Sequence, residues 1–446
     1  MLSRRQFLQT STALAAGAAI VPGARSSSKL YAADSPNEQL RMGCIGVGSM
    51  GCGDAGHFNR LCNIVALADV DEEYGIARAM RAGIGCRDEK RPDVYKDYRR
   101  VLERDDIDVV SVVTPDHWHV KIAIEALQSG KHVFCQKPLT LTLEENILIR
   151  EACRKYGKVF QVGTQQRSQR DQFMKAAIMI RKGFLGEIRN IVCDIGGSPT
   201  SGPLATEAVP ASLDWEMWQG PAPRHDFIPR RCHYEYRWWY EYSGGKFTDW
   251  GAHHIDCALW ALNLQTQGTG PISFDGTKAK HPVAFKDGYP EVDNQYNTSH
   301  DFDIVCKFEN GMEMHVVSGS PDGNGILFEG TKGRIHVSRG RIKGGALDTL
   351  PQDAITPEDY VALYNGKPYE GHKENFIRCI REGGKPVSDV ESHVQAMHCC
   401  HLCGIAARLN REVRWDPAAE KIVGDDQAAS FFGREMYRGY EMPTIS

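Results

Sequence analysis

Two side chains suited to proton transfer, Asp249 and His253, stand four positions apart in the stretch DWGAH. On a helix this spacing puts both on one face, where the carboxylate can orient the imidazole. An imidazole with its ordinary pKa of ~6.5 suits a residue that takes a proton from a substrate near neutral pH. We expect His254, which points about 100° away round the helix, and Asp256 to be supporting residues.

A third candidate for chemistry is Lys137, which ends the apolar run HVFCQK just before Pro138. If this run is a strand of a parallel sheet, Lys137 lies at its carboxyl end, where such sheets bind ligands. Its ammonium can then donate a hydrogen bond to a substrate hydroxyl and to the carbonyl oxygen that develops from it. The preceding residue, Gln136, is neutral, so we expect the charge of Lys137 to be held less firmly than beside an acid.

A glycine-rich loop, GVGSMG, runs from Gly46 to Gly51, directly after one apolar run and at the start of a helix-like one. Its glycines permit a tight turn and the close approach of a pyrophosphate, which binds at the positive end of the helix. Asp69 ends the next apolar run, where a carboxylate bonds the ribose 2′-hydroxyl of NAD and repels the 2′-phosphate of NADP. The sequence therefore predicts bound NAD. The expected cofactor-binding residues are Gly46, Gly48, Ser49, Met50, Gly51, Asp69, Thr114, His119 and Gln136.

The elements that must position these residues alternate between strand and helix up to about residue 164. The strand-like runs are 40–46, 63–70, 108–115, 131–138 and 158–164, and the helix-like runs are 50–62, 118–130 and 142–156. Such alternation predicts a parallel sheet with helices on both faces.

Beyond residue 165 the pattern changes to alternating strands within 187–197, 301–319 and 325–338. Asn310-Gly311 stands between two of them and predicts a hairpin turn of the primed type. Helices are expected over 371–385 and 391–410. This half predicts a mixed or antiparallel sheet in a second domain.

Composition indicates a soluble two-domain enzyme, with 446 residues of which 41% are hydrophobic and 25% charged. The net charge of −4, without a basic stripe, argues against a nucleic-acid partner. Among 14 cysteines, Cys44, Cys135, Cys193 and Cys306 lie in strand-like runs and are expected to act as small hydrophobic residues.

A group of histidines and cysteines near the C-terminus suggests zinc at first sight. These residues occupy neighbouring positions of one predicted helix and therefore point around it, and no second group follows to complete a tetrahedron. We predict no metal site. The group consists of His398, Cys399, Cys400, His401 and Cys403.

The first residues, MLSRRQFL, carry the adjacent pair Arg4 and Arg5 ahead of the apolar run 13–24. This is the pattern of a twin-arginine export signal, which is read by machinery that carries folded proteins. The apolar run is too short to span a ~30 Å hydrocarbon core, so no stable membrane span is expected. A chain folded in a reducing cytoplasm is also expected to form few disulfides.

The stretches TPDHWHVKIAIEALQSGKHVFCQKPLTLT and GGKFTDWGAHHID together resemble the Gfo/Idh/MocA family, the relatives of glucose–fructose oxidoreductase and inositol dehydrogenase. The family's Glu-Lys-Pro stands here as Gln136-Lys137-Pro138. The resemblance implies an α/β Rossmann domain followed by an α+β open-faced β-sheet domain. We expect residues 1–33 to be signal peptide and linker, 39–164 the NAD-binding domain, and 165–446 the C-terminal substrate and oligomerisation domain.

The resemblance also implies hydride transfer between a nicotinamide and a sugar or polyol hydroxyl carbon, in an exported, periplasmic homo-oligomer. Lys137, Asp249 and His253 are then the catalytic residues. Aromatic rings can stack on sugar C–H faces, and Gln165 and Arg167 end a strand that faces the same crevice. The expected substrate-binding residues are Gln165, Arg167, Trp238 and Tyr240.

Three functions remain open at this point. The first is an NAD-dependent oxidoreductase, and the second is a glycoside hydrolase that oxidises its sugar only transiently. The third, a binding protein with an inactive Rossmann domain, is disfavoured because Lys137, Asp249 and His253 are all present. Export of the folded chain suggests the hypothesis that NAD is fitted before export and then retained.

Overall fold

The first sheet is parallel throughout, with the strand order β3-β2-β1-β4-β5-β6. We describe it in a computed structural model that covers residues 39–87 and 90–445, so the twin-arginine segment lies outside the described residues. β4 and β5 are almost wholly buried, as expected for strands covered on both faces. The strands are β1 (Arg41–Ile45), β2 (Asn63–Ala68), β3 (Asp93–Tyr95), β4 (Val109–Val112), β5 (His132–Cys135) and β6 (Phe160–Val162).

Helices cover both faces of this sheet, and one of them comes from the far end of the sequence. Phe376 of α12 (His372–Glu382) packs with Phe58 of α1 (Ser49–Phe58) and Phe134 of β5, with ring centroids 6.3 and 5.9 Å away. The first domain is therefore completed by a helix from the C-terminal part of the chain. The other helices of this part are α2 (Arg78–Arg81), α3 (Arg99–Leu102), α4 (His119–Gln128) and α5 (Leu143–Tyr156).

The second sheet is mixed, with the order β15-β14-β13-β7-β12-β11-β8-β16-β17. β7 and β12 are parallel, and the other neighbours are antiparallel. A short hairpin of β9 (Phe285–Lys286) and β10 (Tyr289–Pro290) stands apart from it. The strands are β7 (Ile188–Asp194), β8 (Ser273–Asp275), β11 (Asp303–Lys307), β12 (Glu313–Val317), β13 (Gly325–Gly330), β14 (Gly333–Val337), β15 (Ile342–Lys343), β16 (Glu412–Asp416) and β17 (Lys421–Ile422).

The hairpin between β11 and β12 differs from the primed turn expected from Asn310-Gly311. Phe308 donates its N–H to the carbonyl of Met312, which leaves a three-residue loop. Only Gly311 has a left-handed φ, at 82°, whereas a primed two-residue turn requires it at the preceding residue also. The strand pairing was predicted correctly and the turn type was wrong.

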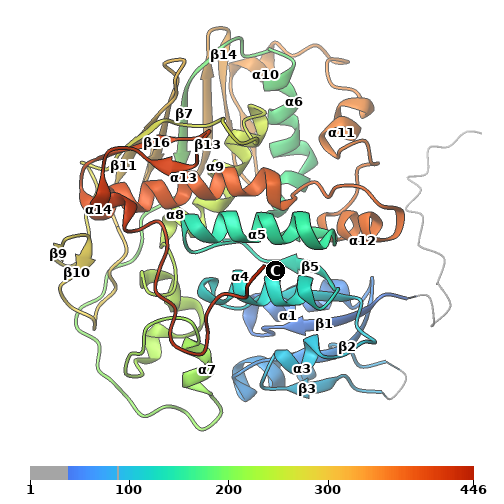
Figure 1. The fold of residues 1–446 in the computed structure, drawn as a ribbon. Helices are drawn as coiled ribbons and strands as arrows, with labels where there is room; N and C mark the ends of the chain where they lie inside the picture. The colour runs from blue at the N-terminus through green and yellow to red at the C-terminus, as the bar shows by residue number, and fades with distance from the viewer. Residues whose placement is uncertain (1–38, 88–89, 446) are drawn as a thin grey trace, which may run out of the picture. The chain divides into compact units, whose positions relative to one another are not determined.

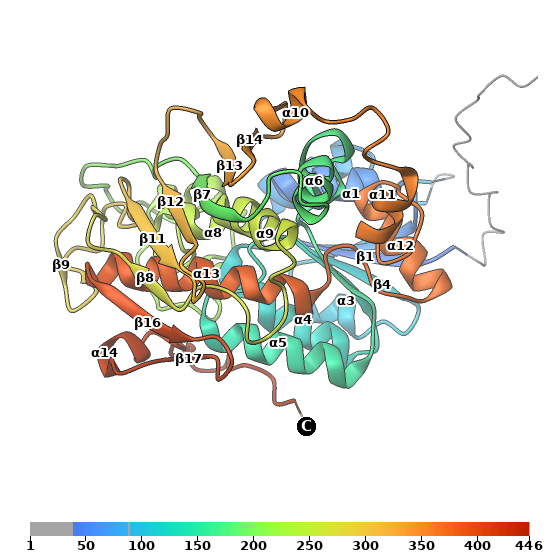
Figure 2. The ribbon, with the colours of Figure 1, turned by 90° about the horizontal axis from the view of Figure 1, so that it is seen from above.

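Helices α13 (Val390–Leu409) and α5 pack against each other between the two sheets (Figure 1 and Figure 2). Asp389 caps the start of α13 by accepting the Ser392 N–H, and Asn410 ends it in the left-handed conformation. The expected helix over 391–410 is thus present. The remaining helices are α6 (Lys175–Arg181), α7 (Trp215–Gln219), α8 (Lys246–Asp249), α9 (Gly251–Ala261), α10 (Gly345–Asp348), α11 (Pro357–Leu363) and α14 (Asp426–Ala429).

The cysteines expected in strands, Cys44, Cys135, Cys193 and Cys306, are buried in β1, β5, β7 and β11. The histidines and cysteines considered for zinc lie along α13, where His401 bonds the Thr140 hydroxyl. Within residues 39–87 and 90–445, no helix is long and apolar enough to cross a membrane.

Candidate active site

The glycine loop turns sharply between β1 and α1. Gly46 has a φ of 77°, and a Cβ there would lie 2.5 Å from the Val113 carbonyl oxygen, so the position requires glycine. A Cβ on Gly48 would approach the Tyr74 ring at 2.8 Å. The loop therefore delivers the N-terminus of α1, with its unpaired N–H groups, to the carboxyl edge of the sheet.

Asp69 follows β2 at the same edge. One carboxylate oxygen accepts the N–H of Val47 from the glycine loop at 2.8 Å, and the other accepts the N–H of Asp71 at 3.0 Å. Burial outweighs these hydrogen bonds and raises the pKa of Asp69 to about 6. The carboxylate is thus tied to the loop that is expected to bind a pyrophosphate.

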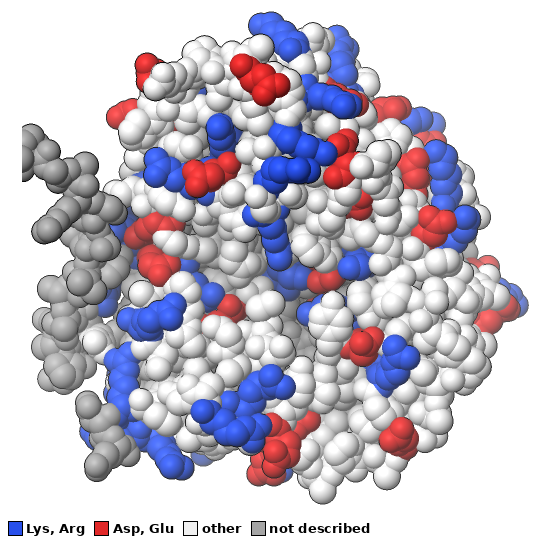
Figure 3. Space-filling model, turned by 180° about the vertical axis from the view of Figure 1, so that it is seen from behind, with Lys and Arg blue, Asp and Glu red and all other residues white. Residues whose placement is uncertain are grey.

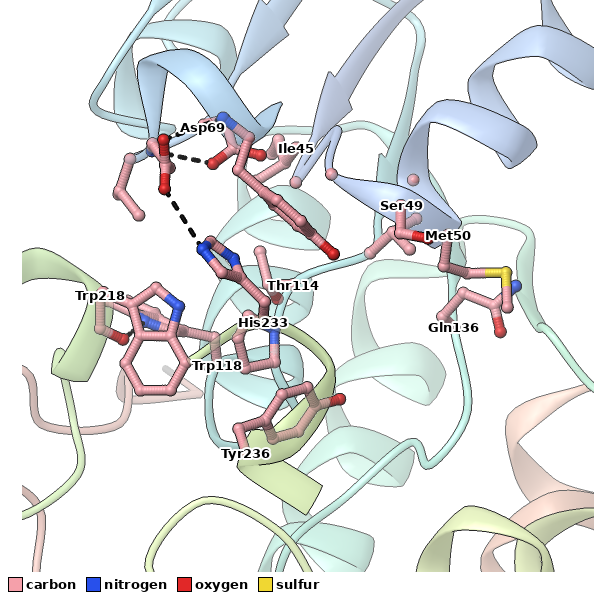
Figure 4. A pocket seen from close by; sticks show the side chains of 18 of the residues that line it. Ile45, Ser49, Met50, Asp69, Thr114, Trp118, Gln136, Trp218, His233 and Tyr236 are labelled. Carbon is pink, nitrogen blue, oxygen red and sulfur yellow. Dashed lines mark hydrogen bonds and ion pairs between the residues drawn. The ribbon is translucent and has the colours of Figure 1, made fainter. Parts of the chain in front are cut away.

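A cavity opens between the glycine loop, Asp69 and Lys137, and it is lined by eight of the nine residues expected to bind NAD, all except His119. Figure 4 shows Ser49, Met50 and Gln136 on one side of it, with Trp118, Trp218 and His233 on the opposite side. The second group includes residues of the long connection between β7 and α8. This connection, which spans 195–245, forms a roof over the cofactor cavity.

Main-chain hydrogen bonds hold the roof to the Rossmann domain. Glu72 donates its N–H to the Ser212 carbonyl at 2.9 Å, and Asp214 donates to the Val70 carbonyl at 3.0 Å. His233, with a left-handed φ of 52°, stacks on Tyr74 with ring centroids 3.6 Å apart.

The same histidine also binds a carboxylate of the Rossmann domain. Nε2 of His233 lies 3.5 Å from the carboxylate of Asp71, the contact drawn in Figure 4. One end of the cavity is therefore closed by a contact between the two domains.

Lys137 and Asp249 meet at the other end of the cavity. The Lys137 ammonium lies 2.6 Å from a carboxylate oxygen of Asp249 and also donates to its main-chain carbonyl at 3.0 Å. That carbonyl is free because the helix breaks at Trp250: His253 donates its N–H to the Trp250 carbonyl instead. Lys137 therefore has an acidic neighbour after all, which comes from the second domain and not from position 136.

The break also changes the expected arrangement of Asp249 and His253, which belong to consecutive helices, α8 and α9, and not to one continuous helix. Burial alone would raise the pKa of Asp249, but Lys137 and Arg237 outweigh it and hold the value at about 2. Burial, followed by the charges of Lys137 and Arg339, holds the pKa of His253 well below its ordinary value. At neutral pH the site thus contains a carboxylate, an ammonium and a neutral imidazole.

Gln136 has a different partner from Lys137. Its amide donates to a carboxylate oxygen of Asp54 in α1 at 2.6 Å, and Lys373 of α12 binds the other oxygen at 2.8 Å. All three side chains are buried. Asp54 supplies the carboxylate, so a glutamate at 136 would bring a second negative charge against it.

Arg167 is not available to a substrate, contrary to expectation. Its side chain is 1% exposed, and its guanidinium binds the buried carboxylate of Asp256 in a two-pronged pair and donates to the hydroxyl of Ser392. His393 shares the same carboxylate at 2.8 Å. The arginine and Asp256 form a structural ion pair behind His253.

His119 is another correction. Its ring nitrogens lie 2.6 Å from the Pro138 carbonyl oxygen and 2.8 Å from that of Thr114, and the side chain does not line the cavity. It braces the ends of β4 and β5 and does not contact the cofactor space.

The aromatic stretch near residue 238 contributes residues other than those expected. Trp238 is buried in an aromatic core with its indole N–H donated to Glu235, and Tyr240 bonds His281 beneath the β9–β10 hairpin. Neither lines the cavity, whereas Tyr236 does, donating its hydroxyl to Asp116 at 2.6 Å. Gln165 is half-buried at the end of β6, and its assignment stays a prediction.

Comparison with family models identifies the chain. The model described as an oxidoreductase family NAD-binding Rossmann fold matches residues 40–164, and that of the oxidoreductase family C-terminal alpha/beta domain matches residues 200–442. The chain belongs to the Gfo/Idh/MocA oxidoreductase family. It therefore has that family's NAD-binding Rossmann domain. A twin-arginine translocation signal matches residues 1–21, which indicates export by that pathway.

Individual curated relatives and solved structures share only part of their sequence with this chain. An alpha-N-acetylgalactosaminidase of Shewanella oneidensis is 30% identical over 204 residues, 42% of this chain and 44% of the relative. The aldose–aldose oxidoreductase of Caulobacter crescentus, solved with glycerol, has a TM-score of 0.56 at 18% identity, covering 84% of this chain and 99% of that one. Levoglucosan dehydrogenase, solved with NADH and levoglucosan, has a TM-score of 0.55 at 19% identity. The match covers 84% of this chain and 99% of that one. The aligned part is thus less than half of the curated relative, and the two structures support the fold alone.

Proposed function

We propose that this protein is an exported NAD-dependent oxidoreductase that acts on a hydroxyl carbon of a sugar or polyol and keeps its cofactor bound. The observation that carries the proposal is the Lys137–Asp249 ion pair at one end of the roofed cavity, with His253 near enough for the charge of Lys137 to lower its pKa. These are a cation, an anion and a neutral base within one small cluster. Family membership supports the reaction class.

The cavity fits the dinucleotide. Gly46 tolerates no Cβ, the start of α1 offers N–H groups to a pyrophosphate, and Asp69 suits a ribose hydroxyl. The buried hydroxyl of Thr114 also has no hydrogen-bond partner among the residues that the structure describes. NAD, when bound, supplies the acceptor for the hydride that leaves the substrate carbon.

The chain's own residues handle the proton and the oxygen of the substrate hydroxyl. In the proposed reaction His253 accepts the hydroxyl proton, for which its imidazole must be neutral beforehand, as its lowered pKa provides. The Lys137 ammonium binds the same oxygen and stabilises it as a carbonyl forms. Asp249 holds that ammonium in position, through both its carboxylate and its main-chain carbonyl.

A second candidate function is an NAD-dependent glycoside hydrolase. The roof favours it, because a cofactor that cannot leave must be restored within each turnover. In this reaction the sugar is oxidised, which acidifies the neighbouring C–H; the aglycone is eliminated, water adds, and the sugar is reduced again. The partial match to an alpha-N-acetylgalactosaminidase adds support for this alternative.

The test is to incubate the protein as purified with free sugars and aryl glycosides, following absorbance at 340 nm and the released aglycone. The oxidoreductase predicts reduction of the bound cofactor by a free sugar, reversed by a second sugar. The hydrolase predicts aglycone release without net reduction. Absence of both signals across the panel would contradict the proposal.

A further inference from the structure

Four cations act on the carboxylate of Asp249. Lys137 and Arg237 lie 2.6 and 3.4 Å from the Asp249 carboxylate, and Lys246 and Arg339 act on it over a longer range. Among the described residues, neither Lys246 nor Arg339 has a carboxylate within ion-pair distance of its own. Asp116 also acts on Arg237, so two carboxylates face four cations and the cluster keeps an excess of positive charge.

The two unpaired cations lie against aromatic rings of the catalytic segment. The Lys246 ammonium stands 5.5 Å from the Trp238 ring centroid, and the Arg339 guanidinium stands 4.5 Å from that of Trp250. Trp250 is the residue at the helix break between Asp249 and His253. Partial burial lowers the pKa of Lys246, as expected for a cation that lacks a counter-ion.

The cofactor does not account for this charge. Lys137 and Arg237 line the cofactor cavity, but Lys246 and Arg339 do not. The phosphates of NAD belong at the glycine loop, and an oxidised nicotinamide is itself positive. Figure 3 shows Lys and Arg side chains leading into a hollow at the centre of one face.

We propose that the sugar substrate carries an anionic substituent, a carboxylate or a sulfate ester, and that Lys246 and Arg339 bind it beside the catalytic cluster. This inference rests on the proposed function and names the substrate class of that site. Lys246 is half-buried and Arg339 is exposed, and ammonium and guanidinium groups are suited to such anions.

Binding of the anion also affects the base. Arg339 is one of the charges that depress the pKa of His253, so a substrate anion beside it restores basicity to the imidazole. A charged substrate is thus expected to react faster as well as to bind more tightly than its neutral analogue.

The experiment compares, for glucose, galactose and mannose, the neutral sugar, its uronate and its 6-sulfate. Binding to the protein with its cofactor is measured by calorimetry, and oxidation is measured separately at 340 nm. In at least one series we expect the uronate or the sulfate to bind at least about tenfold more tightly than the neutral sugar. Comparison of the uronate with the 6-sulfate shows whether the site prefers a carboxylate or a sulfate ester.

The variants Lys246→Gln and Arg339→Gln are expected to remove this preference and to leave the binding of the neutral sugar unchanged. Lys421→Gln, on the exposed edge strand β17, is the matched control and is expected to keep the preference. The inference is overturned if charged members bind no more tightly than neutral ones in every series. Tighter binding of the anion without any oxidation would instead support the inference and contradict the proposed function.

Discussion

At the residue scale, His253 is the side chain on which the proposed chemistry depends, because burial and the charge of Lys137 keep its imidazole neutral. We expect His253→Ala and Lys137→Ala each to lower kcat by at least ~10², the range typical of acid–base groups. Cofactor content should stay unchanged, since the replaced side chains do not hold the dinucleotide. The measurement is single-turnover reduction at 340 nm together with the NAD content of each variant.

The control for this pair is His254→Gln, on the same helix. His254 bonds Asn324, and Lys137 is not among the charges that lower its pKa, so its replacement is expected to keep most of the activity. Near-normal turnover in His253→Ala or Lys137→Ala would remove that residue from the mechanism.

Asp69 is expected to select NAD over NADP in a pH-dependent way. Because burial raises its pKa to about 6, the carboxylate is ionised at pH 7.5 and largely protonated at pH 5. The preference for NAD, measured as a ratio of Kd values on cofactor-stripped protein, should exceed about tenfold at pH 7.5 and fall at pH 5.

The variant Asp69→Asn isolates this carboxylate from the titration of the 2′-phosphate itself. It should weaken the preference at pH 7.5 and flatten its dependence on pH. Equal preference in the variant and the wild type would show that Asp69 does not face the 2′ position.

At the element scale, three elements meet through one buried charge network. Asp54 of α1 binds both Gln136 after β5 and Lys373 of α12. Gln136→Glu should therefore destabilise the fold by roughly 2–4 kcal/mol, because two buried carboxylates would share one lysine. Denaturant unfolding measures this loss of stability. Adding Asp54→Asn to the Gln136→Glu variant should restore much of the free energy of unfolding. A neutral effect of Gln136→Glu would show that Lys373 compensates both acids.

The roof over the cofactor cavity is the other element-scale feature. His233 contributes a ring stack on Tyr74 and a contact with Asp71. An aromatic stack is worth roughly 1 kcal/mol, so His233→Ala should release NAD several-fold faster than the wild type. The rate of release is compared through the amount of NAD that remains bound to each protein after prolonged gel filtration. Retention equal to that of the wild type would show that the main-chain bonds of the roof are sufficient.

The sequence predicted the elements whose pattern is local. Buried strands, the glycine loop and Asp69 follow from apolar runs and turn chemistry, and all of them line or frame the cavity. The roof could not be predicted, because Tyr236 and His233 lie in a short 3-10 helix within a long connection that has no helical or strand periodicity. Arg167 was misassigned because a strand end favours ligand binding, while its partner Asp256 is distant in sequence.

The arrangement of Asp249 and His253 could also be predicted only in part. The spacing of Asp249 and His253 indicated their proximity, but only the fold shows that the helix breaks between them and that Lys137 takes the freed carbonyl. The compensation of Gln136 by Asp54 is likewise a contact between residues 82 positions apart.

At the scale of the whole molecule, the twin-arginine signal and the roofed cavity lead to one account. A chain exported after folding reaches a compartment with little free NAD, so a cofactor that dissociates would be lost. The proposed retention of the dinucleotide, with its restoration within each cycle, would explain both the export route and the second domain's cover over the Rossmann cavity.

The most direct test is to purify the exported protein without added nucleotide, denature it, and assay the supernatant for NAD(H). The account predicts close to one NAD(H) per chain and an activity that does not depend on added NAD. Protein that emerges empty, and that consumes added NAD with every turnover, would contradict it.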